Sequence, residues 1–193
     1  MGYTCSLALV YSFCTFAVGQ VIPKPNWYSE STSNGIVIQN SYPKGGLYTG
    51  PIKKNFNYTH LVFFTRVFNA TPKPLALSIN FSADSMAIPD VPQTYVKLFL
   101  PADTMTLDKQ SLFDFGVKDL ESFEKPTWFQ RVINPGDEVL FYVVAIFYQL
   151  SATANNEQRG GNRAEFVLKG QKLFFNMLPQ IDSLPCGQII SSR

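Results

Sequence analysis

The sequence is poor in the residues that most catalytic and metal sites require. Among 193 residues it has a single histidine, His60, and three cysteines, and no His-x-x-x-His, Cys-x-x-Cys or Gly-x-Ser-x-Gly motif occurs. Zinc sites and Ser-His-Asp triads need partner side chains that this sequence does not visibly supply. We therefore expect no catalytic residues, no metal site and no cofactor, and we interpret His60 as part of a core or a sheet face.

Charged residues are also few. They make up 16% of the chain, the net charge is +2, and Lys53-Lys54 is the only adjacent basic pair. Such scattered, nearly balanced charge argues against a nucleic-acid partner. The apolar runs are too short for an integral membrane segment in the mature chain. Hydrophobic residues at 46% and aromatic residues at 15% instead supply the core of one domain of ordinary size.

The first 20 residues have the pattern of a signal peptide. An apolar run from Leu7 to Gly19 ends in the small-x-small sequence Ala17-Val18-Gly19. This pattern predicts cleavage after Gly19 or Gln20 and a secreted or extracytoplasmic protein, in the periplasm or on the cell surface if the source is bacterial. Two competing patterns are present, a myristoylation match at Gly2 and a lipoprotein cysteine at Cys14, but their neighbouring residues suit them less well.

Removal of this segment would leave Cys186 as the only thiol of the mature chain. No intramolecular disulfide could then form. Cys186 lies in a proline-bracketed stretch, Leu-Pro-Cys-Gly, where it is either an inert thiol or the site of an intermolecular bridge.

The segment from Val139 to Tyr148 predicts a central strand. Both alternating sets of its side chains are apolar, which requires cover on both faces, and its β-branched and aromatic content favours strand over helix. Pro135 and Gly136 fit the two middle positions of a type II turn just before it.

Further strands follow from alternation and from proline and glycine turns. They are expected at Gly35–Gln39, Phe56–Asn69, Leu75–Phe81, Thr94–Leu100, Trp128–Ile133, Arg163–Leu168 and Gln171–Met177. We expect 56–69 and 75–81 to form a hairpin across the turn at Thr71–Lys73, and a short helix to lie near Lys118–Phe123.

These elements predict an all-β fold, an antiparallel two-sheet β-sandwich, immunoglobulin-like or jelly-roll, with at most one or two short helices. The expected organisation is a signal peptide at 1–20, an extended N-terminal lead-in with an edge strand at 21–50, the sandwich domain at 51–180 and a C-terminal tail at 181–193. The turn Asn-Pro-Gly-Asp before an apolar strand resembles those of many extracellular immunoglobulin-like modules. This generic likeness implies no particular site.

Aromatic residues in loop-like sequence are the candidate binding residues. Trp27, Tyr28, Tyr42 and Tyr48, together with Trp128, could stack on sugar rings or anchor an interface. We expect a secreted, non-catalytic β-sandwich that binds an unknown protein or glycan partner or takes part in an extracellular assembly. The alternative is a carbohydrate-binding module or a carbohydrate-active enzyme that uses Asp or Glu.

Three Asn-x-Ser/Thr sequons start at Asn57, Asn69 and Asn80. They are glycosylation sites if the source is eukaryotic. A cluster of acidic residues could hold calcium, although a solvated face is favoured because the spacing matches no known calcium loop. Its members are Asp114, Asp119, Glu121 and Glu124.

Overall fold

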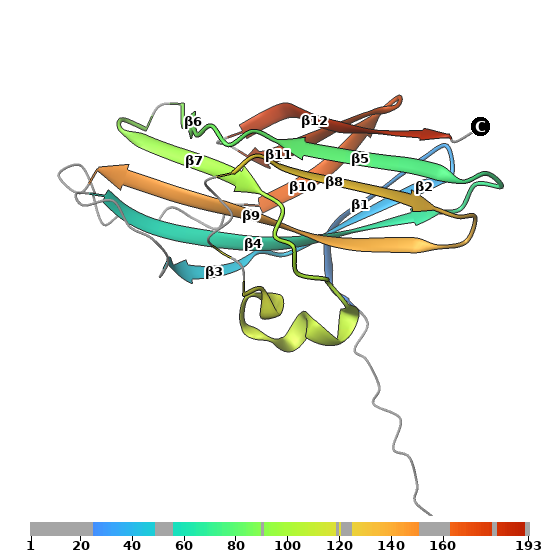
Figure 1. Ribbon diagram of the computed structural model, residues 1–193, viewed down its shortest axis with the longest axis horizontal. Coiled ribbons are helices and arrows are strands. Elements are labelled where there is room, and N and C mark those ends of the chain that lie inside the picture. The colour runs from blue at the N-terminus through green and yellow to red at the C-terminus, as the bar shows by residue number, and fades with distance from the viewer. Residues whose placement is uncertain are drawn as a thin grey trace, which may run out of the picture.

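Two antiparallel sheets pack face to face in the computed structural model (Figure 1), and the prediction of an all-β sandwich is confirmed. The structure describes residues 25–48, 56–89, 91–118, 120, 125–150, 163–178 and 181–191. Within them the strands and 3₁₀ helices are β1 (Trp27–Ser33), β2 (Ile36–Ser41), β3 (Lys44–Leu47), β4 (Phe56–Asn69), β5 (Leu75–Phe81), β6 (Met86–Ala87), β7 (Thr94–Phe99), η1 (Leu107–Ser111), η2 (Phe113–Gly116), β8 (Thr127–Ile133), β9 (Glu138–Leu150), β10 (Arg163–Lys169), β11 (Lys172–Leu178) and β12 (Ile181–Ser191).

The sheet we call A has the strand order β1-β2-β4-β9-β7-β6, and β3 pairs with β4 as well. Sheet B has the order β10-β11-β12-β5-β8. In sheet A, β2 and β3 follow each other along one edge of β4, with Ile36 opposite Asn69 and Lys44 opposite Val62. Pro43 separates them because it offers no N–H to the ladder.

No helix within the described ranges is long and apolar enough to cross a membrane.

Strand β9 is covered on both faces, as the sequence predicts. Phe141, Val143 and Ala145 belong to the core between the sheets. The alternate side chains, among them Tyr142 and Val144, belong to a second cluster on the outer face of sheet A. The predicted turn before β9 is also present, because Asp137 N–H donates to the Asn134 carbonyl over 3.0 Å and Gly136 has a φ of +79°.

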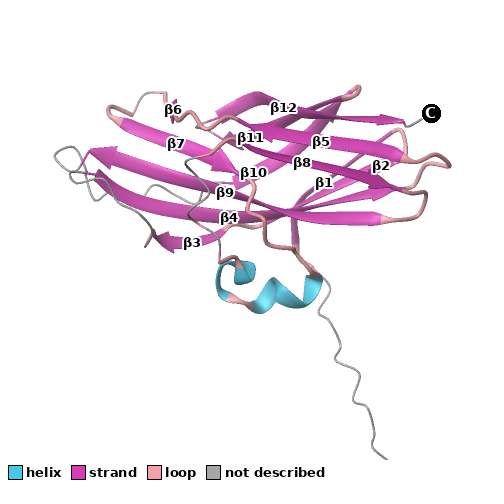
Figure 2. Cartoon of the chain, viewed as in Figure 1, coloured by secondary structure: helices cyan, strands magenta, loops and turns pink. Residues whose placement is uncertain are grey.

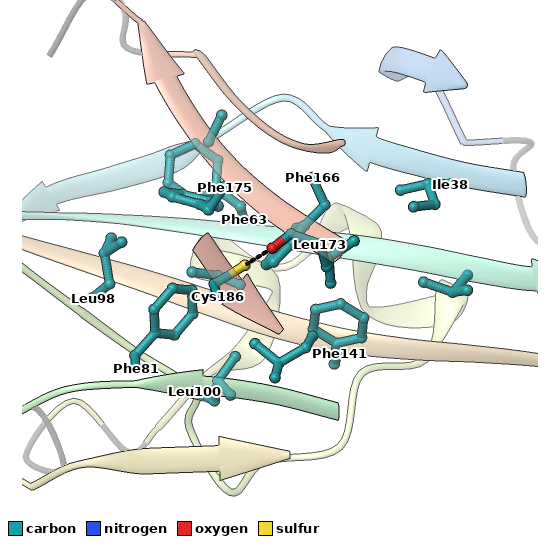
Figure 3. Close-up of a cluster of buried hydrophobic side chains, with 14 of the residues drawn as sticks. Ile38, Phe63, Phe81, Leu98, Leu100, Phe141, Phe166, Leu173, Phe175 and Cys186 are labelled. Carbon is teal, nitrogen blue, oxygen red and sulfur yellow. Dashed lines mark hydrogen bonds between the residues drawn. The ribbon is translucent and has the colours of Figure 1, made fainter. Parts of the chain in front are cut away.

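The core between the sheets is aliphatic and aromatic, and Figure 3 shows part of it. Cys186 lies in this core, 4% exposed, and its Sγ donates to the Leu173 carbonyl over 3.4 Å. Burial raises the pKa of the Cys186 thiol to about 12. Since the thiol is buried and protonated, a bridge from Cys186 to another chain would require the core to open.

The hairpin expected between 56–69 and 75–81 does not form. β4 belongs to sheet A, and β5 belongs to sheet B between β12 and β8. The connection crosses between the sheets and is held by Asn69, whose Nδ2 donates to the carbonyls of Lys73 and Ile133 and whose Oδ1 accepts from Thr71 N–H. Each sheet needs a partner for its apolar face, and this crossing satisfies both better than a local hairpin would.

Two segments assigned to the ends of the chain are also strands. Residues 181–191, expected as part of a tail, form β12 in the interior of sheet B. The strand carries Pro185, a residue that central strands rarely hold, and its ladder with β11 is irregular next to it. Part of the expected lead-in forms β1. The helix predicted at 118–123 falls mainly outside the described residues, and the 3₁₀ helices lie before it (Figure 2).

Candidate ligand-binding face

The outer face of sheet B carries small and polar side chains around one exposed tryptophan. Alternation along β5 directs Leu77 and Ile79 into the core, so Ser78 and Asn80 point outward. On β8, Gln130 lies opposite Ser78 and Trp128 lies opposite Asn80. Residues directly opposite one another in antiparallel strands share a face of the sheet. The register therefore collects a tryptophan, two amides and a hydroxyl on this face.

These side chains line a hollow of about 400 Å³, which we call the Trp128 hollow. Its lining residues are Ser78, Ile79, Asn80, Trp128, Gln130 and Gly187. Trp128 is 71% exposed, a large value for a tryptophan. Gly187 supplies backbone only, and a Cβ at this position would lie 2.0 Å from the Ser78 carbonyl oxygen. Glycine is required there because β12 and β5 approach closely.

The Trp128 hollow can combine stacking with hydrogen bonding. The indole face offers a flat apolar platform, while each amide offers donors and acceptors and the Ser78 hydroxyl offers both. Small-ligand sites commonly unite an apolar or aromatic wall with a few placed polar groups in a few hundred cubic ångströms. The hollow has this composition and carries no charged side chain in its lining.

A larger groove, of about 680 Å³, lies on the other side of Trp128, between β8 and the first half of β9. Asp103 and Glu138 are the two carboxylates among its lining residues. Both are already engaged, because Asp103 Oδ2 accepts from Lys118 N–H over 3.1 Å and Glu138 Oε2 accepts from Arg66 Nε over 2.6 Å. Each carboxylate therefore already has a partner within the chain.

The other predicted aromatic residues do not converge with Trp128. Trp27 on β1 packs edge-on against Phe64 with ring centroids 5.4 Å apart, in the outer cluster of sheet A. Tyr28 and Tyr42 pair with each other at 5.6 Å. Tyr48 is only 4% exposed. Of the five candidates, Trp128 is therefore the one that stands free on a face beside polar neighbours.

The three sequon asparagines differ in exposure. Asn57 and Asn80 are exposed, whereas Asn69 is fully buried and uses its amide within the fold. The folded chain has no room for a glycan at Asn69. Asn80 lines the Trp128 hollow, so a glycan attached there would occupy the hollow itself.

A buried polar pair lies on the opposite side of the molecule, and the sequence does not predict it. His60 on β4 and Asp114 on η2 meet with Nε2 and Oδ2 2.5 Å apart, although 54 residues separate them. Both are 3% exposed. The second polar atom of each side chain, His60 Nδ1 and Asp114 Oδ1, has no hydrogen-bond partner within the described residues. No local motif marks such a pair.

The pair belongs to a cap over the outer face of sheet A. Asp114 and Phe115 have positive φ values of 46° and 53°, so the chain turns sharply to direct Phe115 against Phe64 at 4.9 Å. Tyr142 Oη donates to the Phe115 carbonyl over 2.7 Å. The Lys44 ammonium donates to the carbonyls of Gln110 and Leu112. Burial lowers the pKa of Lys44, and the nearby Asp114 opposes that shift.

We call residues 105–117 the η cap, since they include η1 and η2 and cover Tyr142 and Phe64. Lys44 reaches the cap from β3, which lies so close to β4 that a Cβ on Gly45 would come within 2.0 Å of the His60 carbonyl oxygen. Asp114 is thus a structural anchor rather than a calcium ligand, and Asp119, Glu121 and Glu124 lie outside the described residues. Across the described part of the chain, no group of three or more His, Cys, Asp or Glu side chains could hold a metal ion.

Comparison with known proteins provides no relative. No family model matches the chain, and no curated protein shows significant sequence similarity to it.

Proposed function

We propose that this protein is a secreted, non-catalytic carbohydrate-binding module that holds a glycan in the Trp128 hollow. The observation that carries the proposal is a tryptophan, 71% exposed, beside outward-facing amides on an open sheet face. An exposed tryptophan on a single domain costs solubility, and stacking on the apolar face of a sugar ring would explain it.

The polar neighbours of Trp128 suit a neutral sugar. Sugar hydroxyls both donate and accept hydrogen bonds, and the side chains of Asn80, Gln130 and Ser78 do the same. The lining of the hollow includes no Lys, Arg, Asp or Glu that would favour a charged ligand. We therefore expect neutral oligosaccharides to bind better than sialylated or sulfated ones.

A glycoside hydrolase is less well supported. Such enzymes place two carboxyl groups on either side of the scissile bond. The hollow has none, and the two carboxylates in the neighbouring groove are bonded to Arg66 and to the Lys118 backbone.

Secretion rests on the apolar run and small-x-small site of residues 1–20, which lie outside the described residues. N-terminal sequencing of protein recovered from the medium or periplasm tests it. A chain that begins near Val21 supports secretion, and a chain that still begins at Met1 or Gly2 contradicts it.

Glycan binding can be tested with unglycosylated protein from a bacterial host, which leaves Asn80 free. The wild type is screened on an array of neutral, sialylated and sulfated oligosaccharides, and titration calorimetry then measures the best neutral ligand. Trp128→Ala should weaken binding about 5- to 150-fold, if one stacking contact is worth the about 1–3 kcal/mol that a base stacked on an aromatic side chain contributes. Tyr42→Ala is the matched control, because Tyr42 is a 47% exposed aromatic residue away from the hollow.

Two results would overturn the proposal. One is an array on which the wild type binds no oligosaccharide. The other is binding that Trp128→Ala leaves unchanged while Tyr42→Ala weakens it.

A further inference from the structure

The four terminal strands of the two sheets differ in how well they are protected from pairing with another chain. An exposed edge strand offers unpaired N–H and C=O groups, and proteins usually block it with charges, bulges or short length. In sheet A, β6 has two residues, and β1 has an irregular register between Trp27 and Ser29 and a charged Glu30 at its centre. Both ends of sheet A are therefore protected.

At one end of sheet B, a side chain occupies the edge of β10. The Asn40 side chain binds the backbone of Phe166 twice, since Phe166 N–H donates to Oδ1 over 3.0 Å and Nδ2 donates to the Phe166 carbonyl over 3.5 Å. The amide of Asn40 thus takes the place of a neighbouring strand. Charged residues at Arg163, Glu165 and Lys169 add further protection.

Strand β8, at the other end of sheet B, has only one of these features, a single charge. Its register with β5 is unbroken from Leu75 opposite Ile133 to Phe81 opposite Thr127. Its seven residues, Thr-Trp-Phe-Gln-Arg-Val-Ile, include no proline and one charge, Arg131. Trp128 and Val132 are 71% and 64% exposed, and both belong to this strand. Within the described ranges β8 is paired with β5 alone.

We propose that β8 pairs antiparallel with β8 of a second copy of this chain, about a twofold axis at Gln130. This register joins the two copies of sheet B into one continuous sheet. The partner is a second copy because the sequence of β8 is complementary to itself when it is reversed about Gln130.

On the outer face, the twofold axis places Trp128 opposite the second copy's Val132, so the two exposed apolar residues of β8 cover each other. Gln130 lies opposite its own counterpart, where the two amides can bond to each other. On the inner face, Phe129 lies opposite the second copy's Arg131. Arg131 already lies with Cζ 5.0 Å from the centre of the Phe129 ring within one chain, so this cation–π contact suits both side chains.

The dimer leaves the β5 and β12 side of the Trp128 hollow open. Four of its six lining residues lie on these two strands, whereas Trp128 and Gln130 belong to β8 and take part in the proposed contact. Two hollows would then face the same way on one sheet, about the axis at Gln130. The dimer goes beyond the proposed glycan binding and does not depend on it.

The first test is mass by analytical ultracentrifugation of the wild type from low to high micromolar concentration. We expect a reversible increase from the mass of one chain to that of two. Val132→Lys introduces a charge at the contact and should keep the protein monomeric throughout. Gln188→Lys, at an exposed glutamine of the interior strand β12, should leave the dimer intact.

The second test fixes the register. Gln130→Cys should form a disulfide-linked dimer under mild oxidation, because the axis brings the two residues within about 5.5 Å between Cα atoms. Gln188→Cys, which retains the same other cysteines, should not. A wild type that stays monomeric at every concentration would overturn the proposal, and so would a dimer that Val132→Lys leaves intact or in which both cysteine variants cross-link equally.

Failure of the dimer and failure of glycan binding are distinguishable. Asn80→Ala lies in the hollow on β5 and should reduce glycan affinity while leaving the dimer mass unchanged. Val132→Lys should abolish the dimer without lowering the affinity of the hollow for a soluble oligosaccharide, because it uncovers Trp128 and Gln130 and changes no lining residue. Two added peptides test the self-complementary register, one with the β8 sequence and one with the same residues scrambled. Equal binding of the two peptides to the β8 edge would contradict this register.

Discussion

One outer face of this sandwich is covered by other residues of the chain, and the other is exposed to solvent. On sheet A the outward side chains include Phe64, Tyr142 and Val144, and the η cap covers them. On sheet B the outward side chains include Ser78 and Gln130, beside a tryptophan left 71% exposed. The difference shows that a strand with two apolar faces commits the chain to a third layer, whereas an alternating strand leaves its outer face available to a ligand.

The cover on sheet A also needs polar anchors. The η cap has little regular structure of its own, so His60, Lys44 and Tyr142 bind it from the sheet below. In this way the buried Phe115 carbonyl and one oxygen of the Asp114 carboxylate, Oδ2, obtain partners. The outer face of sheet B needs no such polar anchors, because its exposed amides can form hydrogen bonds with water.

The largest expected effect is a difference in the free energy of unfolding between two variants, each of which loses one aromatic residue from one of the two faces. Phe64→Ala removes a ring that is 2% exposed and should lower the free energy of unfolding by about 3–5 kcal/mol. At a concentration at which the protein is monomeric, Trp128→Ala should change it by about 0.5 kcal/mol or less, because the ring stands on the surface. Urea unfolding followed by circular dichroism measures both. Equal losses would mean that the face around Trp128 is covered in the folded monomer.

The second effect tests the anchor of the η cap. Asp114→Ala leaves buried His60 without its partner and should destabilise the protein by about 3 kcal/mol. Asp108→Ala changes an exposed aspartate of η1 and should cost about 0.5 kcal/mol or less. Thermal unfolding of both variants checks the comparison, and hydrogen exchange should increase in 105–117 for Asp114→Ala alone. A cap that keeps its protection in Asp114→Ala would refute the anchoring role.

The smallest effect is a loss of stability at high pH. Burial, with smaller contributions from Asp103 and Asp108, raises the pKa of Tyr142 from 10.0 to about 12. The folded state therefore keeps a proton that the unfolded state releases, so this contribution is complete below pH 10 and is lost as the pH rises toward 12. Tyr142→Phe, which also removes the bond to the Phe115 carbonyl, should cost about 1 kcal/mol at neutral pH.

The measurement is the free energy of unfolding of the wild type and Tyr142→Phe at intervals across the alkaline range. The gap between them should narrow above pH 10 and reverse before pH 12, because ionised Tyr142 disfavours the folded state and a pKa difference of one unit corresponds to about 1.4 kcal/mol. Tyr42→Phe, at a half-exposed tyrosine, should follow the wild type. A constant gap would show that Tyr142 titrates alike in the folded and unfolded chains.

Much of the fold follows from short-range patterns. The double apolar character of β9, the alternation of Leu75–Phe81 and the Pro135–Gly136 turn each predict the structure that forms. The sequence does not predict strand β12, because Pro185 and Gly187 normally argue against an interior strand. The close packing of Gly187 on Ser78 shows why glycine is needed there, but it involves residues more than a hundred positions apart.

The candidate site was predictable only in part. Trp128 is recognisable as an aromatic residue in a short strand, yet nothing local separates it from Tyr48, which is buried. The neighbours of Trp128 become visible once β5 is known to pair with β8 rather than β4. The His60–Asp114 pair joins a strand to a loop, and no spacing rule links them.

The amino-acid sequence alone determined the longer strands, β4, β5 and β9 among them, and that β9 must be buried on two sides, because alternation and turn chemistry act between residues a few positions apart. The tertiary structure alone decided which strands are neighbours, which face receives the η cap and which tryptophan stays in water. Those outcomes depend on contacts between distant segments, where the burial of one face determines what remains exposed on the other.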